Sequence, residues 1–236
     1  MNRISKKGDS AFFVFPDGES ISIEDTERVL MRILEVRTDE IDIAGALWGL
    51  AQDCFVQSCN EAGVNYIRTA VQFSRDGAET ANRCLFLGLL MEQRENYEAA
   101  AAAYSEVLHL TPLRNDTWYS IYSNLGYSLI RCGHFRKAES YCRAAVDMDS
   151  RRHNAVRNLG LALQGQGLYG EAARAFMTAM NLCPGDLRAY VHLEDLLYNH
   201  EEVASHMPDI AAQVEKCKEQ VMSRGEGKGY RARGRQ

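Results

Sequence analysis

The chain has no apolar run long enough to cross a membrane. Its longest such run, residues 84–91, includes Gly88, whereas a spanning helix needs about 20 apolar residues. Near the N-terminus, the apolar stretch from Ala11 to Phe15 falls short of the apolar core of a secretory signal, which has about 7–15 residues. We therefore expect a cytoplasmic protein that does not insert into membranes.

Signatures of catalysis and of metal binding are missing too. The sequence has no Gly-x-Ser-x-Gly elbow and no His-Glu-x-x-His motif, and its six histidines are spread along the chain. Its seven cysteines include no Cys-x-x-Cys pair. The tight pairing of Cys132 with His134 supplies fewer ligands than structural zinc takes. We expect no enzyme activity, no cofactor and no metal site.

A strong basic excess is also absent. The net charge of −5 leaves no electrostatic footprint for duplex nucleic acid. Residues 223–236 differ from the rest, since they hold five basic residues and one acidic residue in a Gly/Arg-rich composition. Such a composition predicts a disordered basic tail. It fits either a solubilising segment or one that binds RNA or an acidic partner weakly.

What the sequence does contain is one pattern that occurs three times around Gly88, Gly126 and Gly160. Seven positions recur at fixed offsets in each unit: Cys84, Leu87, Gly88, Ala100, Tyr104, Val107 and Pro112; Tyr122, Leu125, Gly126, Ala138, Cys142, Ala145 and Ser150; Val156, Leu159, Gly160, Ala172, Phe176, Ala179 and Pro184. The pattern resembles the tetratricopeptide repeat, a helix–turn–helix unit of about 34 residues. The resemblance implies an all-α solenoid of stacked antiparallel helix pairs.

The same spacing divides most of the chain into units. Well-formed repeats cover 81–118, 119–152 and 153–186, a degenerate repeat covers 40–80, and C-terminal capping helices cover 187–222. The repeat at 81–118 is longer than the others by about one helical turn. We therefore predict that the helix of the next repeat begins early, with Asn115 or Asp116 as its N-cap.

Residues 1–39 do not match the repeat and form an N-terminal extension. Two β-favouring runs within 11–23, separated by Pro-Asp-Gly at 16–18, predict a β-hairpin. A helix with an apolar face is predicted at 24–37. Because an isolated two-stranded hairpin is marginally stable in water, we expect it to dock on the first helices of its own solenoid or on the hairpin of a second molecule.

In this repeat family the functional surface is the concave groove, which the first helix of each pair lines. Here the resemblance implies a groove that is apolar at its N-terminal end, at Leu85, Phe86 and Leu89, and richer in amides and cations towards its C-terminal end. Amides can bond the backbone of an extended peptide, and cations can bind carboxylates. The candidate peptide-binding residues are Asn124, Tyr127, Asn154, Arg157, Asn158, Arg188 and His192.

One subgroup of the family grips the C-terminal carboxylate of chaperone tails with Lys, Asn and Arg at these positions. Asn124, Asn158 and Arg188 fit that arrangement, whereas Ser120 lacks the first charge and His192 replaces a permanent cation. The resemblance thus favours an acidic or C-terminal peptide as the ligand, with Asn158 as the central contact.

We interpret the chain as a cytoplasmic protein–protein interaction scaffold that binds a peptide or client segment in its concave groove. Two alternatives stand beside this interpretation. The protein is a chaperone for a secreted or membrane-inserting client, or it is an oligomeric scaffold, such as a homodimer, that assembles through the N-terminal hairpin.

Overall fold

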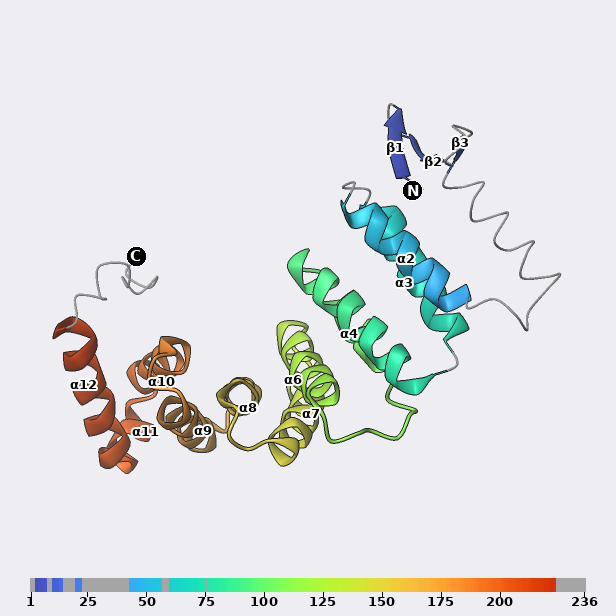
Figure 1. The fold of residues 1–236 in the computed structure, drawn as a ribbon. Coiled ribbons are helices and arrows are strands. Elements are labelled where there is room, and N and C mark those ends of the chain that lie inside the picture. Colours follow the sequence, from blue (N-terminus) through green and yellow to red (C-terminus); the bar gives the residue numbers. More distant parts are fainter. Residues whose placement is uncertain are drawn as a thin grey trace.

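The structure, a computed structural model, describes residues 3–7, 10–14, 20–22, 43–56, 60–74 and 76–223. Residues 43–223 form a row of helices joined by short turns (Figure 1). The helices are α2 Ile43–Val56, α3 Asn60–Phe73, α4 Gly77–Gln93, α5 Tyr97–Ser105, α6 Asp116–Arg131, α7 Phe135–Met148, α8 His153–Gly165, α9 Tyr169–Leu182, α10 Leu187–Asn199, α11 Glu201–His206 and α12 Pro208–Ser223. The predicted all-α solenoid is confirmed.

In each repeat the two helices pack most closely where a glycine of the first helix contacts a large side chain of the second helix. A Cβ atom added to Gly160 would lie 2.6 Å from Cδ1 of Phe176, and one added to Gly126 would lie 2.5 Å from Sγ of Cys142. Both of these partner side chains are fully buried. The recurring glycine and the bulky position sixteen residues later are therefore the two sides of one close helix–helix contact.

The turns between paired helices need a left-handed residue. Gly133 and Gly167 both have φ near +78°, which glycine adopts without a steric penalty. In the first well-formed repeat Glu95 takes this place with φ of 57°, and the next residue, Asn96, caps α5 by accepting the N–H of Ala99. This turn therefore keeps its geometry but carries steric strain that the others lack.

Helix starts follow local capping. The predicted early start of the second well-formed repeat is confirmed, because α6 begins at Asp116 and its N-cap Asn115 accepts the N–H of Trp118 at 3.0 Å. Helix α4 also begins early, at Gly77, where Asp76 accepts the N–H of Glu79. The sequence prediction had placed the start of that repeat at residue 81, so the capping side chain extends the helix by about one turn.

The core is distributed along the row. One buried cluster joins α2 to α6 around Ile67, Tyr104 and Leu125, and another joins α8 to α12 around Phe176 and Leu193. Each helix pair covers the apolar face of its neighbour, as expected of a solenoid whose stability comes from stacking. The short helix α11 between α10 and α12 was not predicted from the sequence.

The N-terminal strands form a three-stranded antiparallel sheet in the order β1 (Arg3–Lys7), β2 (Ser10–Val14) and β3 (Ser20–Ser22). Strands β2 and β3 pair Phe12 with Ser22, as the predicted hairpin requires. Strand β1 was not predicted. It contacts α2, so the sheet docks on the first helix of the solenoid. The predicted helix at 24–37 and the basic tail beyond Ser223 lie outside the described residues.

Candidate functional site

The first helices of successive pairs line the inner side of the solenoid. Helix α4 contacts α6, and α6 contacts α8, in addition to the contacts within each pair. Figure 1 shows these pairs following a curve, with α6, α8 and α10 towards its inner side. The side chains along this inner side form the candidate binding groove.

The N-terminal end of the groove is apolar and accessible. Phe86 and Leu89 of α4 are 36% and 40% exposed. The ring of Trp48 from α2 packs edge-to-face on Phe86, with centroids 5.2 Å apart. Large apolar side chains that stay accessible beside an aromatic neighbour can bury the apolar side chains of a ligand.

An arginine held between two tyrosines lies next along the groove. The guanidinium of Arg131 stands 4.1 Å from the centre of the Tyr97 ring and donates to the hydroxyls of Tyr97 at 2.7 Å and Tyr127 at 3.0 Å. The hydrogen bond to Tyr127 raises the pKa of Arg131. Arg131 is exposed, its hydrogen-bond partners here are neutral phenols, and the nearby carboxylate of Glu95 also raises its pKa. Its guanidinium can therefore meet an acidic group of a ligand, in competition with Glu95.

A half-buried carboxylate lies between α4 and α6. Glu92 accepts a hydrogen bond of 2.8 Å from the hydroxyl of Ser128. Burial raises the pKa of Glu92, although the bond from Ser128 acts in the opposite direction. This bond links two successive first helices, α4 and α6.

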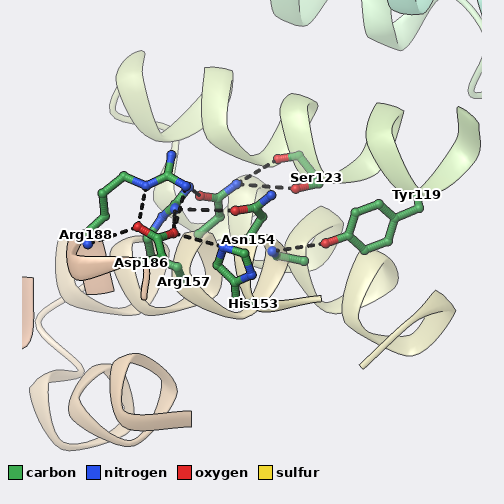
Figure 2. A network of polar contacts seen from close by, with 9 residues as sticks. Tyr119, Ser123, His153, Asn154, Arg157, Asp186 and Arg188 are labelled. Carbon is green, nitrogen blue, oxygen red and sulfur yellow. Dashed lines mark hydrogen bonds and ion pairs between the residues drawn. The ribbon is translucent and has the colours of Figure 1, made fainter. Parts of the chain in front are cut away.

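The C-terminal end of the groove is a polar network centred on Asp186 (Figure 2). Its Oδ2 accepts from Arg188 at 2.7 Å, from Arg157 at 3.1 Å and, when the imidazole is protonated at Nε2, from His153 at 2.9 Å. Its Oδ1 accepts from Nε of Arg188 at 2.7 Å and from the Arg188 backbone N–H at 3.1 Å. These bonds, led by that from the Arg188 side chain, hold the pKa of Asp186 well below its usual range.

The comparisons with known proteins agree with this architecture. The family model for the tetratricopeptide repeat matches residues 123–186. Human tetratricopeptide repeat protein 7A is 33% identical over 139 residues, which is 58% of this chain and 15% of that protein. Human tetratricopeptide repeat protein 7B is 32% identical over 95 residues, or 40% of this chain and 11% of that protein. The chain contains tetratricopeptide repeats.

Solved structures share the solenoid at lower sequence identity. A fragment of MamA from Desulfovibrio magneticus RS-1 superposes with a TM-score of 0.61 at 18% identity, covering 76% of this chain and 97% of the fragment. YrrB, described as a tetratricopeptide-repeat protein with an unusual peptide-binding site, superposes with a TM-score of 0.56 at 18% identity, covering 84% of this chain and 97% of its own. These likenesses establish the fold. The chain spans only a small part of the human relatives' length.

The structure gives the predicted contact residues of the tetratricopeptide groove different roles. Asn158 is 3% exposed, and its amide donates to the backbone oxygen of Ser123 at 3.1 Å and accepts from Arg157 at 3.4 Å. The predicted central contact is thus covered by the neighbouring helix α6, and its amide nitrogen and oxygen both have partners within the protein. Arg157 is 9% exposed, and burial lowers its pKa.

The other predicted contact residues differ in how deeply they are buried. Asn154 is exposed and accepts from Arg157 at 3.5 Å. His192 is half-buried and stacks on Phe176 with centroids 5.5 Å apart, and burial, followed by the charge of Arg157, lowers its pKa. Asn124 and Tyr127 are half-buried on α6. The structure brings Asn154, Arg157, Asn158 and Arg188 into one network and leaves Asn124 outside it.

Three residues of the candidate site were not among the predicted contacts. Asp186 is one of them, although an aspartate at an N-cap next to a predicted row of cations is a signal for an internal ion pair. Tyr97 and Arg131 stand one repeat length apart, a spacing that brings equivalent positions of adjacent repeats together.

Two structural features do not occur among the described residues. No helix there combines the length and apolarity needed to cross a membrane. That part of the chain also holds no cluster of three or more histidine, cysteine, aspartate or glutamate side chains arranged for a metal ion.

Proposed function

We propose that the inner groove binds an extended segment of another protein, which makes this chain an interaction scaffold. The observation that carries the proposal is the exposure of Phe86 and Leu89 on α4, at repeat positions that the family uses for its concave surface. In a solenoid the concave surface is the extended binding surface. Apolar side chains of this size gain most when a partner covers them.

The groove offers three kinds of contact to such a segment. Phe86, Leu89 and Trp48 can take apolar side chains, and the half-buried Asn124 can bond a peptide backbone. Arg131, stacked on Tyr97, can bind an acidic side chain or a C-terminal carboxylate. The proposed ligand is therefore an apolar segment that carries an acidic group near Arg131.

A cytoplasmic location is part of the proposal. The six described cysteines, among them the buried Cys54, Cys84 and Cys142, are free thiols. Unpaired cysteines are typical of proteins that work in a reducing compartment.

The experiment uses peptides selected from a random library on the immobilised full chain, followed by calorimetric titration. Phe86→Ala combined with Leu89→Ala should weaken the selected peptide at least roughly tenfold, because removing two partly accessible apolar side chains costs about 2 kcal/mol of contact. The matched control is Leu182→Ala. Leu182 is 38% exposed but belongs to α9, a second helix, and should leave the affinity within about twofold.

Two results would contradict the proposal. The selected peptides could bind the double variant as tightly as the unaltered chain, or the Leu182→Ala control could lose as much affinity as the double variant. Either result would place binding outside the groove.

A further inference from the structure

The groove contains a complete carboxylate-binding arrangement that the protein's own chain already fills. The carboxylate of Asp186 is 12% exposed and receives Arg188 through two side-chain hydrogen bonds of 2.7 Å, which is the bidentate geometry that arginine offers to carboxylates. Arg157, only 10% exposed, adds a third bond at 3.1 Å. A ligand carboxylate at this end of the groove would seek the same donors.

The arrangement draws its parts from two successive first helices. Arg157 belongs to α8, whereas Asp186 is the N-cap of α10 and Arg188 lies in the first turn of α10 (Figure 2). Asn158 then extends the network to Ser123 on α6. The site is therefore built where three first helices meet, which is also where a ligand in the groove would pass.

We propose that Asp186 is a built-in substitute ligand that closes the C-terminal end of the groove to acidic segments. This inference rests on the proposed function and deepens it. The partner segment carries apolar or neutral residues where it passes α8 and α10, and its acidic group belongs at Arg131 instead.

Competition between the two carboxylates favours the internal one. Asp186 is attached to the same helix as Arg188, so its effective concentration at the site exceeds that of any free ligand in ordinary solution. It also accepts the backbone N–H of Arg188 at 3.1 Å and so caps α10. An incoming carboxylate would have to break this cap as well as the ion pairs.

Removing the charge of Asp186 should open the site. Asp186→Asn keeps a side-chain oxygen for the helix cap, because asparagine caps helices about as well as aspartate. It leaves Arg157 and Arg188 without this carboxylate. We expect the variant to bind acetylated tetraglutamate at least roughly tenfold more tightly than the unaltered chain, in calorimetric titration at low salt.

Matched variants distinguish tetraglutamate binding at this site from a general effect of the protein's net charge. Asp209→Asn removes the same charge from an exposed position on α12 and should leave tetraglutamate binding unchanged. Adding Arg188→Ala to Asp186→Asn should cancel the gain. Asp186→Ser, which also retains a capping oxygen, should reproduce the gain if the asparagine variant folds poorly.

Either of two results overturns the inference. A folded Asp186→Asn or Asp186→Ser variant could bind tetraglutamate no better than the Asp209→Asn control. Alternatively, the unaltered chain could already bind tetraglutamate in a manner that Arg188→Ala abolishes. The groove proposal is tested separately. Asp186→Asn could raise the affinity for tetraglutamate while the affinity for the selected peptides does not depend on Phe86 and Leu89. This pair of results would refute peptide binding at Phe86 and Leu89 but not the role of Asp186.

Discussion

Replacing two helical glycines by alanine tests the packing of the repeat directly. Gly49 and Gly160 both lie inside helices, α2 and α8. A Cβ atom added to Gly49 meets nothing within 4 Å. One added to Gly160 lies 2.6 Å from Cδ1 and Cε1 of Phe176 and 3.0 Å from its Cζ. The same chemical change therefore meets open space in one repeat and a buried ring in another.

The expected effects have opposite signs. Alanine is about 1 kcal/mol more favourable than glycine within a helix, so Gly49→Ala should raise the unfolding free energy by about 0.5–1 kcal/mol. At Gly160 the same helical gain is outweighed, because overpacking costs about 1–3 kcal/mol. Phe176 is fully buried and cannot swing away into solvent. Gly160→Ala should lower the unfolding free energy by about 1 kcal/mol or more.

Thermal unfolding followed by circular dichroism measures the difference. About 2–4 °C of midpoint shift corresponds to 1 kcal/mol for a chain of this length, so the two variants should lie several degrees apart, on either side of the unaltered protein. Midpoints are compared under identical conditions because solenoids depart from two-state unfolding. Equal shifts, or a stabilised Gly160→Ala variant, would refute the packing role assigned to the recurring glycine.

Three further predictions follow from single sites. Glu95→Gly should raise the unfolding free energy by about 0.5–1 kcal/mol in chemical denaturation, because glycine removes the left-handed strain at φ of 57°. Burial raises the pKa of Glu92, so ionised Glu92 is more stable in the unfolded chain than in the folded one. Glu92→Gln should therefore raise the melting temperature at pH 7. The variant should lose this advantage below pH 4.5, the ordinary pKa of glutamate, because Glu92 is then protonated in both states. Burial also raises the pKa of Cys142 to about 12, so in mass-spectrometric mapping iodoacetamide should modify the half-exposed Cys183 well before Cys142.

The repeat pattern follows from residue spacing alone. Gly126 and Cys142 lie on adjacent helices of one pair, so their contact depends on a short stretch of chain and leaves a visible pattern. The cap at Asn115 and the turn at Gly133 are local as well, since each depends on the backbone within a few residues. Interactions of this range can be predicted from spacing and residue type.

Sequence spacing assigned helix faces to the groove, but not how deep each side chain lies. Of the residues assigned to its apolar end, Phe86 and Leu89 are exposed, whereas Leu85 is half-buried. Asn158 occupies an equivalent position two repeats later, yet it is covered by α6. Position in the repeat sets the direction of a side chain, whereas its depth depends on how closely the neighbouring helix approaches.

The charge of the groove, by contrast, depends on how the helices stack in three dimensions. Arg157 and Asp186 are 29 residues apart, in α8 and at the N-cap of α10, and either could have faced solvent. Stacking brings the start of α10 against α8, and the low exposure of both side chains favours their pairing, because an unpaired buried charge is strongly unfavourable. A row of cations that looks like an anion site in the sequence thus becomes, in the folded solenoid, a site that its own aspartate has already filled.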